Sequence, residues 1–264
     1  MKENDEILLQ FKGYNDTPLL WKSSFYGLLQ FQLDCIEIRP SINHPEKRLG
    51  KRAEQFFIER LTNSKDQEVV CQNVQIKVGK ITVGEIDCIV NSNGSLVHVE
   101  HIYKFYLYDE TIGQSEIDHW IGPNRIDSLL FKLDKLKEKQ LPLLRTKEAE
   151  NLLKSLKIRP ESLEQKVHFK AQLFVPHGKT VLFESINKDA VAGWYYRKSE
   201  LPKSARYFLP SKIEWLVNPH DNVKWKEFKD ISVELDKLLE NKKSPICWIN
   251  SNTGDLEKCF VVWW

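Results

Sequence analysis

The chain of 264 residues lacks the features that identify several common classes of protein. Its five cysteines are an odd number and no two have Cys-x-x-Cys spacing, which argues against a disulfide scaffold or a zinc site and favours a reducing compartment. There is no glycine-rich phosphate loop, no Ser-His-Asp signature, no low-complexity run and no convincing internal repeat. The functional signal therefore has to come from the pattern of polar residues on predicted strands and helices.

Membrane and targeting signals are also missing. No apolar run approaches the roughly 18 residues that span a bilayer, and the first six residues are too acidic for a signal peptide. We therefore expect a cytoplasmic protein with no membrane partner. The net charge of +2 neither requires nor excludes nucleic acid, because a local basic patch can bind it. A solvated helix face is the commoner explanation of the basic cluster formed by Lys47, Arg48, Lys51 and Arg52.

The strongest local signal is a β-hairpin. Two alternating runs, at residues 81–91 and 95–107, flank an Asn-Gly pair, which favours a two-residue turn between antiparallel strands. Counting back from that turn places Asp87 directly opposite Glu100. Directly opposed residues have Cβ atoms about 4.5–5.5 Å apart. The sequence therefore predicts two carboxylates side by side.

The hairpin face that carries these acids is polar. It holds Glu85, Asp87, His98, Glu100 and Lys104. One interpretation is a solvated face, since antiparallel sheets are often apolar on one side only. The other is a site, because two bare carboxylates repel each other and favour a cation between them or a basic side chain near them. Magnesium prefers carboxylate oxygens and water, so it is the cation that we expect.

Periodicity predicts an alternation of helices and strands within one domain, 1–264. The expected core covers about residues 43–176 and the C-terminal elaboration about 177–264. In the core we expect a helix at 45–61, strands at 68–78, 81–91 and 95–107, a helix at 123–139 and a strand at 167–175. Residues 1–42 read as a short apolar lead, residues 140–143 as a helix stop, and 145–166 as a surface helix and connection. Short strands near 206–217 and 245–262 and a helix at 225–240 are expected in the aromatic-rich C-terminal third.

In this order the chain resembles the PD-(D/E)XK nuclease superfamily, and more closely the bacterial domain-of-unknown-function family 1853, which has been assigned to that superfamily. The matching motifs span about residues 48–144. They are Arg48-Leu49-Gly50-Lys51-Arg52-Ala53-Glu54, Gly84-Glu85-Ile86-Asp87, His98-Val99-Glu100, Lys104-Phe105-Tyr106-Leu107, Trp120-Ile121-Gly122-Pro123-Asn124, Asp127 and Gln140-Leu141-Pro142-Leu143. The resemblance implies an α/β fold with a restriction-endonuclease-like core: a helix, a three-strand meander, a helix and a strand, with a mixed central sheet and an added C-terminal α/β region.

The resemblance also implies a set of site residues. Asp87 and Glu100 would hold Mg²⁺ or Mn²⁺, Glu54 would orient an outer water or a second metal, and Lys104 would position the attacking water. The expected substrate-binding residues are Asn124, Asp127, Lys132 and Gln140.

One position departs from the superfamily motif. The motif lysine stands two residues after the glutamate, where this chain has Ile102. Lys104 keeps the strand face but lies roughly 13 Å from Glu100 along the strand, so Lys132 on the following helix could supply the cation instead.

The resulting hypothesis is a metal-dependent phosphodiesterase, a nuclease, acting on nucleic acid. The displaced lysine favours an alternative, a catalytically impaired module of the same fold that binds nucleic acid or a protein partner. A third interpretation is a structural protein in which Lys104 or Arg125 bridges the two acids. Binding of Mg²⁺ or Mn²⁺ that depends on Asp87 separates the catalytic interpretation from the other two.

Overall fold

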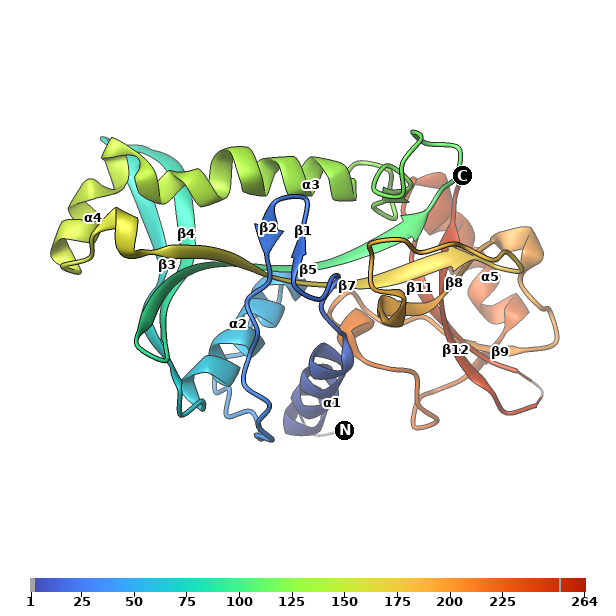
Figure 1. Ribbon diagram of the computed structural model, residues 1–264. Coiled ribbons are helices and arrows are strands. Elements are labelled where there is room, and N and C mark those ends of the chain that lie inside the picture. Colours follow the sequence, from blue (N-terminus) through green and yellow to red (C-terminus); the bar gives the residue numbers. More distant parts are fainter. Residues whose placement is uncertain (1–2, 252) are drawn as a thin grey trace.

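The computed structural model describes residues 3–251 and 253–264. Their strands form one ten-stranded mixed sheet in the order β10-β9-β11-β12-β8-β7-β5-β4-β3, with β6 paired to β5, and a separate small hairpin of β1 and β2 (Figure 1). The strands are β1 Ser24–Phe25, β2 Leu28–Leu29, β3 Gln67–Val78, β4 Ile81–Ser92, β5 Ser95–Tyr108, β6 Trp120–Ile121, β7 Glu164–Pro176, β8 Val191–Arg197, β9 Arg206–Phe208, β10 Lys226–Glu227, β11 Ile246–Asn250 and β12 Leu256–Val262.

The sheet changes direction twice. Strands β3, β4 and β5 form an antiparallel meander, and β5, β7, β8 and β12 then run parallel to one another. Beyond β12 the sheet becomes antiparallel again through β11, β9 and β10. The C-terminal third therefore extends the sheet that carries the predicted hairpin.

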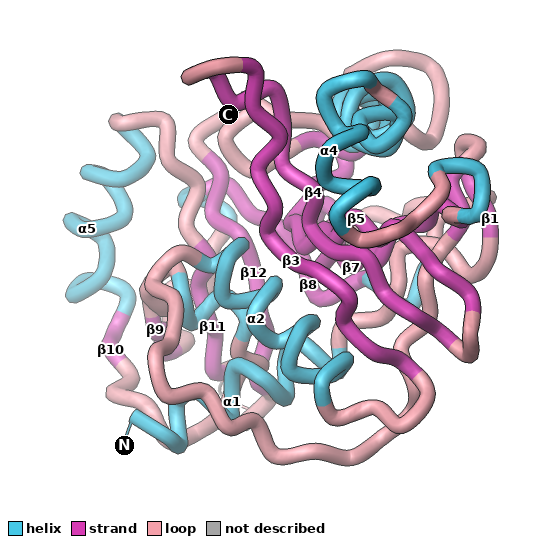
Figure 2. The backbone as a smooth tube through the Cα atoms, turned by 90° about the vertical axis from the view of Figure 1, so that its left-hand side faces the viewer, coloured by secondary structure: helices cyan, strands magenta, loops and turns pink. Residues whose placement is uncertain are grey.

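Helices cover both faces of this sheet. They are α1 Glu3–Asp16, α2 Leu49–Thr62, α3 Leu129–Lys135, α4 Glu150–Ser155 and α5 Phe228–Glu240. One core cluster joins α1 and α2 to the sheet, and a second joins α3 to the opposite face of β5 and β7. Figure 1 shows α3 above the sheet with α1 and α2 below it, and Figure 2 shows the β3–β4 end of the sheet between α4 and α2. No helix in the described part of the chain is long and apolar enough to cross a membrane.

The short apolar lead predicted at residues 1–42 contains a helix, α1, that was not predicted. Its buried residues Ile7, Phe11 and Tyr14 recur at helical spacing and pack against α2 and the sheet. Leu20 and Trp21, which follow the helix, are both buried.

The close contact of α1 with the C-terminal third depends on Gly13. A Cβ added there would lie 1.9 Å from the carbonyl oxygen of Leu216 and 2.9 Å from its carbonyl carbon. We therefore expect Gly13→Ala to destabilise the protein by on the order of 1–3 kcal/mol, since backbone must move to relieve the overlap. The matched control is Gly50→Ala in α2, where no atom lies within 4 Å, and it should stabilise by about 0.5–1 kcal/mol. Urea unfolding of both variants measures these changes in stability. Equal changes in Gly13→Ala and Gly50→Ala would contradict the close contact between Gly13 and the backbone of Leu216.

The core strands agree with the predicted ones to within a few residues, and short strands occur in both C-terminal segments where they were predicted. The strand expected at 206–217 ends at Phe208 and is followed by a 3₁₀ turn, Ile213–Leu216, because Pro210 has no N–H to continue a ladder. The segment 245–262 holds two of the short strands predicted there, β11 and β12, whereas β8 was not predicted.

Residues 145–166 are more than a surface connection. Ala149, Leu153 and Leu163 are buried with Ile86 and Ile89, so this segment covers part of β4. The prediction failed because the buried residues are spread over short 3₁₀ turns and the six residues of α4, with no long helical stripe to reveal them.

Candidate functional site

The candidate site lies where β4 separates from β5. The predicted hairpin register is confirmed, since the ladder runs from Ser92↔Ser95 to Cys88↔Val99. Both turn residues, Asn93 and Gly94, have positive φ, as a type I′ turn requires. The next step of this register would set Asp87 against Glu100, and there the paired ladder ends.

Asp87 bridges the two strands at this fork with its side chain. Its Oδ2 accepts a hydrogen bond of 2.9 Å from the backbone N–H of His101. The N–H and C=O of one residue in a strand point to the same side, so the His101 carbonyl also faces the fork. The Asp87 carboxylate, which is near enough to Glu100 for the two charges to interact, and the His101 carbonyl therefore both face the place where β4 leaves β5.

Glu100 is fully buried on the α3 side of the sheet and is held by two side chains. Gln140 Nε2 donates to its Oε2 at 2.6 Å, and His98 Nε2 lies 3.1 Å from its Oε1. Gln165 Nε2 lies 3.3 Å from the other His98 ring nitrogen, which fits an Nε2–H tautomer donating to Glu100. These contacts fix the carboxylate without a lysine or arginine partner among the described residues.

The helical segment after β6 supplies the basic group. Gln140, which donates to Glu100, accepts a hydrogen bond of 2.7 Å from Lys132 Nζ. In an unbroken α-helix, residues eight apart lie about 80° from each other around the axis. Here α3 passes into a π-helical segment, Leu136–Gln140, which winds less per residue and brings Gln140 round toward Lys132. Such π turns occur frequently at functional sites.

The bounds of this helical segment differ from the predicted ones. Residues 122–127 form a turn, in which Gly122 N donates to Asp127 O and Arg125 has a φ of 59°. The helix starts only after Ser128, whose Oγ caps the N–H of Phe131. No stop occurs at 140–143, because Pro142 is accommodated in a 3₁₀ segment, Leu141–Arg145, that continues the coil seen in Figure 1.

Helix α2 brings Glu54 to the border of the site, together with a lysine that was not expected there. Lys51 Nζ lies 2.8 Å from Glu54 and 3.0 Å from Glu85. Burial lowers the pKa of Lys51, but its hydrogen bonds to the two carboxylates outweigh that effect and raise it. The helix begins at Leu49 instead of residue 45. Sequence reasoning assigned Lys51 to a solvated face, and its i,i+3 spacing to Glu54 was the available signal.

The electrostatics of the fork favour a cation. Desolvation, and then the charge of Glu100, raise the pKa of Asp87 to about 8, although the hydrogen bond from His101 acts against this and Glu54 adds to it. Desolvation lowers the pKa of Lys132 to about 8, while Glu100 acts in the opposite direction. The carboxylate pair is therefore short of positive charge when only the protein surrounds it.

Three of the predicted site residues form a second group, near the C-terminal half of β5. Lys104 comes from the strand itself, and Asn124 and Asp127 come from the turn before α3. Lys104 Nζ is 2.6 Å from Asp127 Oδ2 and so does not contact the two acids of the fork. Asn124 Oδ1 accepts a hydrogen bond from the backbone N–H of Ser244. The structure thus brings Glu54, Asp87, Glu100, Lys132 and Gln140 into one neighbourhood and Lys104, Asn124 and Asp127 into another.

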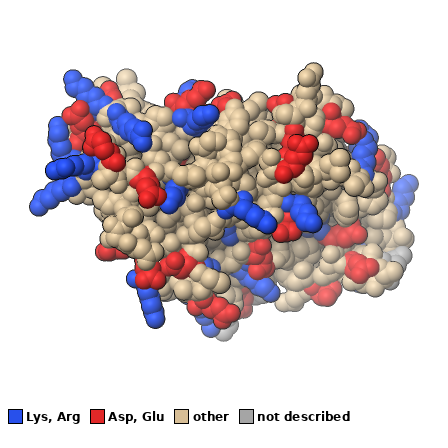
Figure 3. Space-filling view, viewed as in Figure 1, with Lys and Arg blue, Asp and Glu red and all other residues tan. Residues whose placement is uncertain are grey.

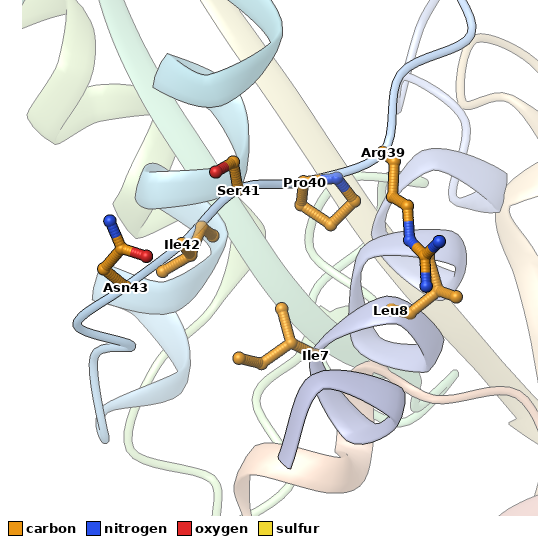
Figure 4. A pocket seen from close by; sticks show the side chains of 7 residues that line it. All are labelled: Ile7, Leu8, Arg39, Pro40, Ser41, Ile42 and Asn43. Carbon is orange, nitrogen blue, oxygen red and sulfur yellow. The ribbon is translucent and has the colours of Figure 1, made fainter. Parts of the chain in front are cut away.

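One of the surface hollows borders the fork, and another lies away from it. A hollow of about 390 Å³ is lined by Lys51, Glu54 and Asn73 among others, and borders the site from α2 and β3. Another of about 210 Å³, between α1 and residues 39–43, is lined by none of the predicted site residues (Figure 4). On the face in Figure 3, Lys and Arg are interspersed with Asp and Glu and form no broad basic surface among the described residues.

The donor set suits a hard cation. Within the described residues no group of three or more His, Cys, Asp or Glu side chains could hold a metal ion. Two carboxylates and one carbonyl are nevertheless a donor set that Mg²⁺ accepts, since it commonly keeps several waters and takes only one or two protein carboxylates.

Comparison with known proteins gives one result. No curated protein and no solved structure matches the chain. The family model described as "Domain of unknown function (DUF1853)" matches residues 29–262, which include every residue of the fork and almost all of the sheet. The chain therefore belongs to the DUF1853 family.

Proposed function

We propose that this protein is a metal-dependent phosphodiesterase that cleaves nucleic acid, built on a restriction-endonuclease-like core of α2, β3, β4, β5, α3 and β7. One observation carries the proposal: half-buried Asp87 and fully buried Glu100 lie close together at the fork, and neither is paired with a lysine or arginine among the described residues. Such a pair is costly unless a cation joins it.

Asp87, Glu100 and the His101 carbonyl would hold Mg²⁺ or Mn²⁺. When bound, the metal lowers the pKa of a coordinated water and polarises a phosphoryl oxygen of the substrate. His101 and Gln140 keep the two carboxylates in position by hydrogen bonds of 2.9 and 2.6 Å. Their task is orientation, since the hydrogen bonds exist without the metal.

We assign the proton transfer to Lys132, because its amine is linked through Gln140 to Glu100 while Lys104 is engaged by Asp127. An amine with a pKa of about 8 exchanges protons readily near neutral pH. The neutral amine can take a proton from the attacking water, whose oxygen forms the new bond to phosphorus as the bond to the leaving oxygen breaks. Glu54 borders the fork and would orient an outer water or a second metal.

A second candidate function has its own observation. The position that carries the motif lysine is Ile102, which is 3% exposed and packs in the core with α3. A core of this kind without a lysine at the motif position fits a catalytically impaired module that binds nucleic acid or a protein partner. The two candidates differ in whether bound substrate is hydrolysed.

Thermal melting with Mg²⁺ or Mn²⁺, followed by an assay on bis(p-nitrophenyl) phosphate and mixed nucleic acids, tests the proposal. A metal concentration of about 100 Kd stabilises the native state by about 2.7 kcal/mol, which for a chain of this size is a rise in Tm of roughly 5–10 °C. We expect that rise together with metal-dependent hydrolysis. Absence of hydrolysis, with or without the rise in Tm, would contradict the proposal. Binding of nucleic acid by such an inactive protein would favour the impaired module.

A further inference from the structure

The edge of β5 beyond the fork is open and carries a pocket. The ladder with β4 ends at Val99, and β6 pairs with β5 only at Leu107 and Tyr108. Between these points a hollow of about 210 Å³ adjoins the strand. It is lined by Lys104, Phe105, Gly122, Pro123, Asn124, Ile126, Asp127 and Lys212. The second group of predicted residues therefore surrounds a cavity on the same strand as Glu100.

Two lysines from distant parts of the chain meet in this pocket. Lys104 is paired with Asp127, whereas Lys212 makes no ion pair with any carboxylate in the described residues. The Lys212 ammonium instead lies 3.2 Å from the ring centroid of Trp215. Desolvation, and then the positive charge of Lys104, lower the pKa of Lys212 to about 8, so the two ammonium groups are close enough to repel. The Asp127 carboxylate already neutralises Lys104, so a bound anion would gain mainly from Lys212.

A neighbouring amide adds a donor to the pocket. Asn124 Oδ1 already accepts a hydrogen bond from the backbone N–H of Ser244. The amide NH₂ group, Nδ2, is therefore the end of the side chain that can donate to a ligand. Two ammonium groups and an amide donor match the oxygens of a phosphate.

We propose that this pocket binds a backbone phosphate of the strand that is cleaved at Asp87 and Glu100, with Lys212 as a positioning residue supplied by the C-terminal third. The inference rests on the proposed phosphodiesterase function. Four residues of strand separate Glu100 from Lys104, which is about 13 Å, or the rise of about four nucleotides along one duplex strand. The substrate must therefore extend several nucleotides beyond the scissile phosphate to use the pocket.

Kinetics on two substrates test the inference with the full-length protein. We expect Lys212→Gln to raise KM for a 12-nucleotide substrate about tenfold and to leave hydrolysis of bis(p-nitrophenyl) phosphate unchanged, because that diester does not reach the pocket. Lys212→Arg should retain most of the affinity. Lys203→Gln, a change of an exposed lysine in the turn before β9, is the matched control and should have no effect. Equal kinetics of Lys212→Gln and wild type on both substrates would overturn the inference while leaving the proposed function intact.

A binding measurement separates failure of the inference from failure of the proposed function. If the wild type hydrolyses neither substrate, the phosphodiesterase proposal fails, and fluorescence anisotropy with the same labelled oligonucleotide then tests the pocket. A weaker Lys212→Gln complex, with a salt slope lower by about one, would support a phosphate contact there. Unchanged affinity and slope, or no binding by the wild type, would overturn it.

Discussion

Asp87→Asn should abolish metal-dependent cleavage and at the same time raise the melting temperature of the metal-free protein. The carboxylate lies at the fork beside buried Glu100, where desolvation and that neighbouring charge raise its pKa to about 8. Asparagine keeps the shape and can still accept the hydrogen bond from His101 N, but it removes the charge that the fold must bury. The substitution therefore removes a proposed metal ligand and, at the same time, the negative charge beside Glu100 that destabilises the metal-free protein.

The pH dependence of this gain has a definite sign. An acid whose pKa is higher in the folded protein than in the unfolded chain loses stability as pH rises, because the unfolded chain ionises first. For Asp87 the loss begins near pH 4 and is complete above about pH 8. The stability of Asp87→Asn minus that of the metal-free wild type should therefore increase across this window, to on the order of 3–5 kcal/mol at pH 8 as an upper value.

Urea unfolding from pH 5 to pH 8 in the presence of a chelator measures that difference directly. Taking the difference cancels the contributions of other shifted groups, such as His168 and Lys170, that are present in both proteins. Asp66→Asn, an exposed acid just before β3, is the matched control and should change neither stability nor cleavage. An Asp87→Asn protein that still cleaves at the wild-type rate would remove Asp87 from the site. If the free energy of unfolding of metal-free Asp87→Asn falls with pH as steeply as that of the wild type, the claim that Asp87 and Glu100 repel each other in the folded protein is refuted.

The part of this site that the sequence predicts is the part that depends on local chemistry. An Asn-Gly pair fixes the turn, and the period of two in the strands then carries the register to Cys88 and Val99, the residues next to Asp87 and Glu100. A count along the sequence was therefore enough to place two acids that are 13 residues apart. The four predicted core strands follow from the same alternation.

What the sequence did not predict depends on contacts that periodicity does not contain. The π-helical turn that brings Gln140 toward Lys132 has the same apolar stripe as an ordinary helix. Lys212 is over a hundred residues from Lys104, and only the continuation of the sheet into the C-terminal third brings it to the same pocket. Long-range packing of this kind has no signature in a single sequence.

Lys132→Gln should lower kcat about 100-fold or more, whereas Lys104→Gln should mainly raise KM for long substrates. The two variants remove the same charge from lysines that both face the α3 side of β5, so each is the matched control of the other. Lys132 is linked to Glu100 through Gln140, and a positioned proton-transfer group contributes about 10²–10⁴-fold to a rate. Lys104 is held by Asp127 beside the pocket, where its loss weakens strand binding but leaves the reacting atoms in place.

The pH profile distinguishes a chemical role of Lys132 from a structural one. The neutral amine is the form that accepts a proton, and the pKa of this amine is about 8 without metal, so the wild-type kcat should rise with pH and level off at or below pH 8; this rising limb should be absent in Lys132→Gln. A bound cation at the fork would move the limb to lower pH, because it further disfavours the ammonium form. A Lys132→Gln variant that keeps the limb and the rate, beside a Lys104→Gln variant that loses both, would return the catalytic role to the lysine on β5. If both variants keep the wild-type activity, neither lysine is needed, and the carboxylates and the metal alone carry the reaction.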